Sequence, residues 1–298
     1  MAIASIINTK DLNKAEAIIL SAGYCHSFTY RSGAEKGPKE VIRCLHGNLE
    51  FFDRFTLNEP VHINRTGHYN LKGINRLTSE KMVKTISDFY TQYKSKFILL
   101  LGGDHSISIG PFSFFSNFRD SSKITILQID AHPDLRNDTL DYQKTSDRFS
   151  HACVMRRACE MGFKTVQVGI RTYSIYDREF ITKNNLKIFE WGKEKEHSID
   201  DILSSIETEN VYLTVDVDGI DPAHTPATGT PIPGGLEWHF TRRLIRNLIL
   251  NKNLIGADIV EVSPVKDDVL TQYSAAQLAY DIISYKLLKD KGMLKFYD

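Results

Sequence analysis

Short apolar runs recur along the chain, with longer segments of helical spacing between them. Unbroken runs of β-branched and other apolar residues are typical of strands buried on both faces of a sheet. The sequence predicts such strands at residues 16–20, 97–101, 124–129, 165–170, 186–189, 211–216 and 254–262, with an edge strand within 48–70. About eight strands that alternate with helices predict an α/β fold with a central parallel sheet covered on both faces.

Helices are predicted between these strands. Gly37-Pro38 reads as a helix start, and Thr78 precedes apolar residues at helical spacing from Met82 to Tyr93. No Pro/Ser/Gly-rich linker interrupts the pattern, so residues 1–298 are predicted to form a single domain. Further helices are predicted at 106–118, 151–161, from 198 onward, at 238–249 and at 274–288.

The strand predicted at 124–129 ends in three polar residues that could share one ligand. Asp130, His132 and Asp134 alternate on a chain that is still nearly extended, so all three side chains can point to one side. Two carboxylates and an imidazole facing one point repel each other and lose solvation unless a cation lies between them. A turn with solvated acids is the alternative interpretation of this motif taken alone.

Two other strands end in the same kinds of residue. The strand at 97–101 leads through two glycines to His105, and the strand at 211–216 ends in Asp216 and is followed by Asp218. In an open parallel sheet, ligands bind beyond the carboxyl ends of the strands. We therefore expect six metal ligands at one rim of the sheet: His105, Asp130, His132, Asp134, Asp216 and Asp218.

This ligand set is too large for one zinc ion, which usually takes four ligands. Four carboxylates and two imidazoles suit two divalent ions that share carboxylates. The oxygen-rich mixture favours Mn²⁺, with Co²⁺, Ni²⁺ or Zn²⁺ as substitutes. Two such ions per chain make a hydroxide that bridges them the expected nucleophile.

The motifs around these residues resemble the ureohydrolase family, which includes arginase and agmatinase. The resemblance implies a three-layer α/β/α arginase-like fold and hydrolysis of a guanidino group with release of urea. Among the branches the chain looks most like agmatinase, which converts agmatine to putrescine in polyamine biosynthesis. The matches run in family order over most of the chain: G-G-D-H-S at 102–106, D-A-H-P-D at 130–134, S-H-A at 150–152, D-V-D-G-I-D-P at 216–222, G-T-P-I-P-G-G at 229–235 and D-I-V-E-V-S-P at 258–264.

The resemblance also implies roles for individual residues. Glu261 would pair with the planar guanidinium through two parallel hydrogen bonds, and His151 would act as a proton shuttle. Together with Asp134 they are the predicted catalytic residues. A local ion pair for Glu261 and a structural role for His151 are the alternatives. Two carboxylates would bridge the ions and each ion would have two further ligands: Asp130 and Asp216 as bridges, His105 and Asp134 at one site, and His132 and Asp218 at the other.

The far end of the pocket should decide among guanidino compounds. Arginase has an Asn/Thr/Ser-rich loop after D-x-H-x-D for the α-amino and α-carboxylate groups of arginine, and residues 134–139 have no matching run. Gly229-Thr230-Pro231 makes the formiminoglutamate branch a poor match. Arg31 could pair with a carboxylate, which keeps 4-guanidinobutyrate, and thus a guanidinobutyrase, open as an alternative. Arginase is the other alternative within the family. The loop at 135–149 is expected to line this end and to attract agmatine's ammonium through its acids, Asp138, Asp141 and Asp147.

Composition narrows the partners and the compartment. Lys+Arg and Asp+Glu both number 37, and this zero net charge gives no reason to expect nucleic acid or a membrane surface as a partner. Residues 1–8 do not form a convincing signal peptide. The four cysteines form no C-x-x-C pair, as is typical of reduced thiols in the cytoplasm. We expect a cytoplasmic enzyme for a small cationic guanidino substrate, and the resemblance suggests a homotrimer or homohexamer.

Two alternatives come from outside this branch. A deacylase of the related deacetylase fold would use a single zinc ion on acetylated amines, and six candidate ligands argue against it. A catalytically inactive member would serve as a binding or regulatory subunit. The complete ligand set, together with Glu261 and His151, argues against that role.

Overall fold

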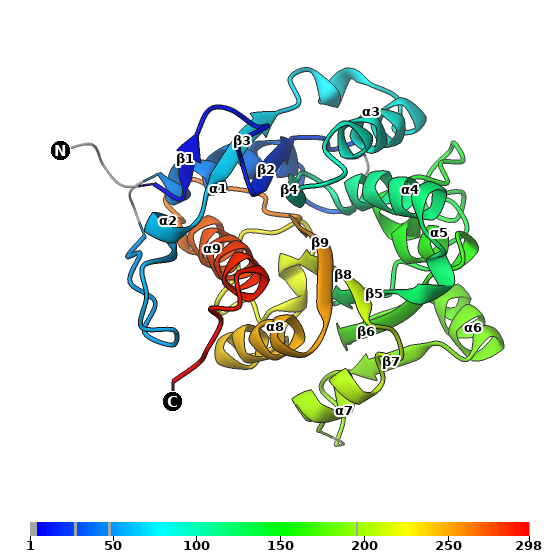
Figure 1. The fold of residues 1–298 in the computed structure, drawn as a ribbon. Helices are drawn as coiled ribbons and strands as arrows, with labels where there is room; N and C mark the ends of the chain where they lie inside the picture. The colour runs from blue at the N-terminus through cyan, green and yellow to red at the C-terminus, as the bar shows by residue number, and fades with distance from the viewer. Residues whose placement is uncertain (1–4, 27–28, 47–48, 195, 298) are drawn as a thin grey trace.

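In the part of the chain that the structure describes, nine parallel strands form one sheet in the order β1-β3-β2-β4-β9-β8-β5-β6-β7 (Figure 1). The computed structural model describes residues 5–26, 29–46, 49–194 and 196–297. Two sequence predictions fall partly outside the described residues. These are the prediction that residues 1–8 do not form a signal peptide, at residues 1–4, and the edge strand predicted within 48–70, at residue 48. The strands are β1 Ile7–Thr9, β2 Ala17–Ala22, β3 Thr66–Asn70, β4 Phe97–Gly102, β5 Ile124–Ile129, β6 Lys164–Ile170, β7 Lys187–Glu190, β8 Asn210–Asp216 and β9 Asn253–Val260.

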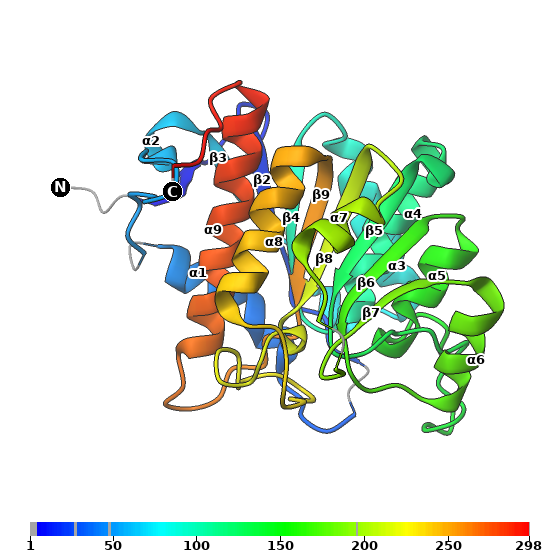
Figure 2. The same cartoon turned by 90° about the horizontal axis from the view of Figure 1, so that it is seen from below.

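Helices cover the sheet on both faces, so that the molecule has three layers (Figures 1 and 2). One layer is built from α1 Gly37–Leu45, α7 Ile199–Ser204, α8 Trp238–Asn251 and α9 Leu270–Asp290, with the short α2 Pro60–Ile63 beside α9. The opposite layer is built from α3 Ser79–Gln92, α4 Ile109–Phe118, α5 Val154–Glu160 and α6 Ile175–Asn184. The predicted three-layer α/β/α fold is confirmed.

The central strands are buried on both faces, which is why they read as unbroken apolar runs. Every residue of β2, β4 and β5 is buried. Because side chains alternate along a strand, Leu99 and Leu101 belong to the core on the side of α1, α8 and α9, while Ile98 and Leu100 belong to the core on the side of α3 and α4. Two hydrophobic cores therefore hold the sheet from opposite sides and fix the ends of its strands.

The structure corrects four details of the prediction. Strand β1 is a ninth strand that was not predicted, since three partly exposed residues give no apolar run. Helix α6 was missed because it has little apolar periodicity, although Ser174 and Asp177 form a capping box at its start. Helix α9 begins at Leu270, before the predicted start at 274. Strand β9 ends at Val260, so that Glu261 follows the strand and does not belong to it.

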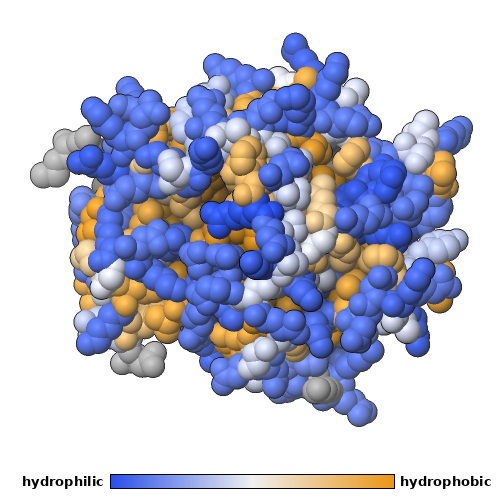
Figure 3. Space-filling model, turned by 45° about the vertical axis from the view of Figure 1, so that its right-hand side comes forward, coloured by the Kyte–Doolittle hydropathy of each residue, from blue (hydrophilic) through white to orange (hydrophobic). Residues whose placement is uncertain are grey.

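The face drawn in Figure 3 is covered mainly by hydrophilic residues, with smaller apolar areas between them. Among the described residues, no helix is both long enough and apolar enough to cross a lipid bilayer. In the sequence, likewise, no apolar run approaches the roughly 18 residues that are needed to cross a bilayer.

Candidate metal centre and active site

Four strands that are neighbours in the sheet bring the predicted site residues to one edge. Strands β4, β9, β8 and β5 lie side by side. His105 follows β4, Glu261 follows β9, Asp216 ends β8, and Asp130 follows β5. Because all four strands are parallel, their carboxyl ends lie at the same edge. The structure therefore brings the six predicted ligands and Glu261 into one region.

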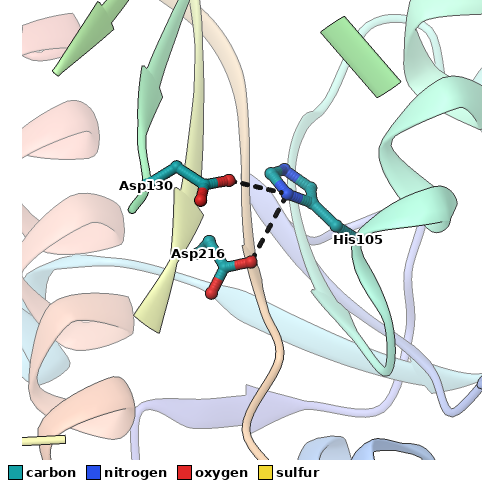
Figure 4. A group of neighbouring side chains, drawn as sticks. All are labelled: His105, Asp130 and Asp216. Carbon is teal, nitrogen blue, oxygen red and sulfur yellow. Dashed lines mark ion pairs between the residues drawn. The ribbon is translucent and has the colours of Figure 1, made fainter. Parts of the chain in front are cut away.

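One imidazole lies at the centre of a group of three carboxylates. The Nδ1 atom of His105 lies 3.1 Å from Oδ2 of Asp130, 3.1 Å from Oδ2 of Asp134 and 3.5 Å from Oδ2 of Asp216. Figure 4 shows His105 facing Asp130 and Asp216 from the opposite side of the site. All four side chains are buried.

The second imidazole adjoins the same cluster. The Nδ1 atom of His132 lies 3.1 Å from Oδ2 of Asp218 and 3.5 Å from Oδ1 of Asp130. Among the described residues, two sets of side chains have the geometry to hold a metal ion, namely His105, Asp130 and Asp216, and Asp130, His132 and Asp218. Asp130 belongs to both sets, so this geometry suits two ions that share a carboxylate.

Short-range hydrogen bonds set the turns that aim these carboxylates. Oδ1 of Asp130 accepts the backbone N–H of His132 at 2.6 Å, and Oδ1 of Asp216 accepts that of Asp218 at 2.9 Å. Each aspartate thus shapes the turn that follows its own strand. Oδ1 of Asp218 accepts the N–H of Ala131 at 3.1 Å, which ties the β8 turn to the β5 turn. The remaining carboxylate oxygens face the cluster.

The backbone is also constrained at the site. Asp134 and Glu261 adopt positive φ angles of 52° and 65°, a region that non-glycine residues rarely occupy. Such conformations cost about 1–3 kcal/mol each and concentrate at functional sites. At Gly103, an added Cβ would lie 1.9 Å from the carbonyl oxygen of Tyr24, so only glycine fits the turn that leads to His105.

The electrostatics of the cluster fit a pair of divalent cations. Burial lowers the pKa of His105, but the carboxylates around it outweigh this effect and hold the pKa well above its usual value. Burial, Asp218 and Asp130 raise the pKa of Asp216 well above its usual value, and burial and Asp130 raise that of Asp134 to about 7. His105 Nδ1 is buried without a hydrogen-bond partner among the described residues. Cations among these groups would relieve the repulsion between carboxylates, and an imidazole–carboxylate donor set suits Mn²⁺ and its neighbours.

A cavity of about 310 Å³ opens above the cluster. Oε1 of Glu261 accepts the backbone N–H of His105 at 2.8 Å. Burial and the negative charge of Asp104 raise the pKa of Glu261 well above its usual value. Among the described residues no Lys or Arg forms an ion pair with Glu261. The cavity lining includes His132, Asp134, Asp216, Asp218 and Glu261 from the centre, and Thr29, Arg31, Arg136, His151, Tyr173 and Asp177 from the surrounding loops.

His151 lies on the cavity wall at the start of a short 3₁₀ helix, η5 His151–Cys153. Its Nε2 is 3.3 Å from Oγ1 of Thr29, and its Nδ1 is 3.3 Å from Oγ of Ser150. Burial and the positive charges of His132 and His105 lower the pKa of His151 well below its usual value. A neutral imidazole at this position can accept or pass on a proton.

The acidic loop does not line the cavity as predicted. Asp138 accepts the backbone N–H of Leu140 at 2.9 Å, and Asp147 accepts that of Phe149 at 2.8 Å. Asp141 forms an ion pair with Arg136. Asp138 and Asp141 are held within their own loop, and Asp147 also accepts a hydrogen bond from Oγ of Ser79 on α3 at 3.2 Å. From residues 135–149 the cavity receives Arg136, and Arg31 lies on its wall as expected.

Sequence reasoning missed a set of polar residues that support the ligands. Nε2 of Gln128 donates to Oδ2 of Asp130 at 2.6 Å, and Gln167 donates to Gln128 and to the carbonyl of Pro133. The guanidinium of Arg171 donates to four backbone carbonyls, including those of Asp218 and Gly219. The available signal was a polar residue inside an apolar strand: Gln128 in β5, Gln167 in β6, Thr214 in β8 and Asp258 in β9, all fully buried.

The fold and the site together define an α/β/α protein with a carboxylate–imidazole centre at the carboxyl edge of its sheet. The family model described as Arginase family matches residues 15–284. An N(1)-aminopropylagmatine ureohydrolase of Synechocystis sp. is 33% identical over 282 residues, which cover 91% of this chain and 89% of the relative. An agmatinase of Pyrococcus horikoshii is 31% identical, with 92% and 93% covered.

A solved structure gives the same result. The crystal structure of the agmatine ureohydrolase of Thermoplasma volcanium aligns with a TM-score of 0.82 at 26% identity, covering 98% of this chain and 96% of that one. The chain belongs to the Arginase family, which is the ureohydrolase family that its motifs resemble. The family prediction is confirmed.

Proposed function

We propose that this chain is a ureohydrolase that cleaves the guanidino group of agmatine, or of an agmatine that carries an aminopropyl extension. The observation that carries the proposal is the cluster of two imidazoles and four carboxylates, buried except for the partly exposed His132, which face one another below a cavity that Glu261 also lines. A guanidinium carbon is a poor electrophile because its charge is delocalised. Its hydrolysis therefore needs a strong nucleophile, an orienting group and a proton donor.

We assign the ligands to two ions, with Mn²⁺ as the preferred metal. When bound, the ions would lower the pKa of a water molecule to about 7 and so supply the nucleophile at neutral pH. Two candidate ligand groups, one around His105 and one around His132, share Asp130 and support two separate positions. By the family resemblance, Asp130 and Asp216 would contact both ions, His105 and Asp134 would hold one of them, and His132 and Asp218 would hold the other.

In this proposal Glu261 binds the guanidinium of the substrate and His151 transfers a proton. Glu261 forms no ion pair with a Lys or Arg among the described residues, so its carboxylate is available to accept two parallel hydrogen bonds from a guanidinium. Desolvation of a lone carboxylate is costly, and the bound cation would compensate it. His151, neutral at physiological pH, takes up and delivers the proton that the leaving amine requires.

The names of the relatives support a guanidino substrate that carries an amine and no carboxylate. Proteins named N(1)-aminopropylagmatine ureohydrolase and agmatinase match almost the whole chain, and the substrates in these names lack the α-carboxylate of arginine. A second candidate is 4-guanidinobutyrate. The observation that favours it is the position of Arg31 on the cavity wall, where its positive charge could pair with a carboxylate. Asp138, Asp141 and Asp147, which would repel a carboxylate, do not line this cavity.

The test is urea release with Mn²⁺ and four substrates: agmatine, N(1)-aminopropylagmatine, arginine and 4-guanidinobutyrate. We expect one of the first two to give the highest kcat/KM, with arginine lower by roughly a hundredfold because of its charged α-carboxylate. If 4-guanidinobutyrate is preferred, the second candidate replaces the first. Absence of urea from every substrate would support the inactive binding subunit, and one zinc ion per chain would support the deacylase.

A further inference from the structure

Behind the candidate metal centre, a chain of hydrogen bonds connects His105 to an aspartate outside the proposed ligand set. Nε2 of His105 lies 2.8 Å from Oγ1 of Thr214. Oγ1 of Thr214 donates to Oδ1 of Asp258 at 2.6 Å, and Oη of Tyr212 donates to Oδ2 of Asp258 at 2.9 Å. Thr214, Asp258 and Tyr212 are completely buried. The chain of hydrogen bonds from His105 to Asp258 therefore runs entirely between buried side chains.

The fold specifies this arrangement through strand register. Thr214 of β8 and Asp258 of β9 are direct partners in the parallel ladder. Tyr212, two residues before Thr214, points to the same face of the sheet. An added Cβ at Gly256 would lie 2.8 Å from Cε2 of Tyr212, so glycine at this position allows the ring to lie over β9 and reach Asp258.

The number of available protons decides which nitrogen of His105 carries hydrogen. A threonine hydroxyl has a single proton. Both oxygens of Asp258 already accept hydrogen bonds, and Thr214 uses its proton for one of them. Toward His105 the hydroxyl can therefore only accept, so Nε2 must carry a hydrogen. In a neutral imidazole the lone pair then lies on Nδ1, the atom that faces Asp130, Asp134 and Asp216.

We propose that Asp258 and Thr214 are positioning residues that fix the tautomer of His105 and thereby present Nδ1 to a metal ion. The inference rests on the proposed metal centre but not on the identity of the substrate. His132 provides an internal comparison, because no hydrogen bond of the described residues ties its Nε2 to a buried acid. The imidazole of His105 is thus oriented by the core of the sheet, and among the described residues the imidazole of His132 has no such hydrogen bond.

Three variants separate this role from simple packing. Thr214→Val keeps the shape but removes the hydroxyl, and Thr214→Ser keeps the hydroxyl. Asp258→Asn offers an amide N–H to Oγ1 of Thr214, which would turn the hydroxyl proton toward Nε2 and favour the wrong tautomer. Loss of groups that orient a metal-bound histidine typically lowers metal affinity about 10- to 100-fold.

The experiment is a calorimetric titration of each metal-free protein with Mn²⁺, followed by elemental analysis after dialysis. We expect wild type and Thr214→Ser to bind two ions alike. Thr214→Val and Asp258→Asn should bind one ion about 10- to 100-fold more weakly and the other unchanged. Thermal unfolding of the metal-free forms identifies any variant that fails to fold. Equal binding of both ions by Thr214→Val would overturn the inference and leave the proposed function intact.

A measurement on wild type keeps the test independent of the variants. In protein labelled with ¹⁵N-histidine and loaded with diamagnetic Zn²⁺, NMR should show His105 bound to metal through Nδ1 and protonated at Nε2. Metal on Nε2 would overturn the inference, even if every variant misfolds. Failure of wild type to bind Mn²⁺ or Zn²⁺ would overturn both the inference and the proposed function.

Discussion

The floor and the mouth of the cavity are built in different ways. The floor, defined as His105, Asp130, His132, Asp134, Asp216 and Asp218, stands at the ends of three strands of the sheet. Its acids are tied to neighbouring backbone N–H groups and to buried amides such as Gln128. The mouth, defined as residues 29–31, 136–151 and 172–177, is made of connecting segments. Its charged groups are held mainly within their own loops, as Asp138 and Asp141 are.

This difference separates reaction type from substrate choice. A floor held by two hydrophobic cores keeps the candidate ligands in a fixed geometry, as a metal site requires. Loops tolerate changes of sequence and length, so the same floor can serve different guanidino compounds. Changes in the floor should therefore abolish reaction on every substrate, while changes in the mouth should alter the ratio between substrates.

The largest effect is expected from Asp130→Ala in the floor. Asp130 belongs to both candidate ligand groups, so its removal should release at least one ion and lower kcat/KM at least roughly a thousandfold. Elemental analysis and urea release measure both results. Asp138→Ala is the control, since this loop aspartate does not line the cavity. Wild-type activity with two ions retained in Asp130→Ala would contradict the proposed floor.

Glu261→Gln tests the link between floor and mouth. The amide oxygen can still accept the N–H of His105, but the negative charge that pairs with a guanidinium is lost. We expect kcat/KM to fall several hundredfold, on the order of two charge-assisted hydrogen bonds, with metal content unchanged. Steady-state kinetics give the answer, and Glu179→Gln, an exposed position on α6, is the matched control. If kcat/KM does not change, Glu261 has no role in binding substrate.

His151→Asn tests the proton shuttle on the cavity wall. General acid–base groups contribute about 10²–10⁴-fold, so kcat should fall roughly a hundredfold while KM changes little. His62→Asn at an exposed position of α2 serves as the control. An unchanged kcat would return His151 to a structural role.

Arg31→Gln probes the mouth alone. Loss of this positive charge should favour cationic over anionic substrates, raising the ratio of kcat/KM for agmatine to that for 4-guanidinobutyrate about tenfold. Metal content should stay at the wild-type value. The comparison variant is Lys39→Gln, which removes the same charge from the exposed face of α1. A ratio equal in both variants would mean that Arg31 does not contact the substrate's far end.

The smallest predicted effect is a pH dependence of metal stabilisation. In the metal-free protein the pKa values of His105, His132, Asp216 and Glu261 are raised, so their stabilising contribution is lost as pH rises through these folded-state values. Bound metal removes that loss, and it requires deprotonated ligands. The rise in Tm on adding Mn²⁺ should therefore be larger at pH 9 than at pH 6.5, by roughly 5 °C. A rise in Tm that becomes smaller as pH increases would contradict the assigned ligands.

Activity should also increase from pH 7 toward alkaline values.

The sequence by itself determined the floor. Apolar runs that are followed within a few residues by Asp130, His105 and Asp216 predict both the strand and the position of its candidate ligand, because the carboxyl ends of parallel strands share one edge. Side-chain alternation then placed Asp218 and His132 on the correct side. Local patterns were sufficient because each ligand lies within five residues of its strand.

Only the tertiary structure decided the mouth and the support behind the floor. Asp138, Asp141 and Asp147 looked like pocket residues in the sequence, yet loop hydrogen bonds and Arg136 hold them elsewhere. The pairing of Thr214 with Asp258 depends on β8 and β9 being neighbours across 44 positions of sequence. Such contacts arise from strand order and packing, which no local pattern of apolar and polar residues encodes.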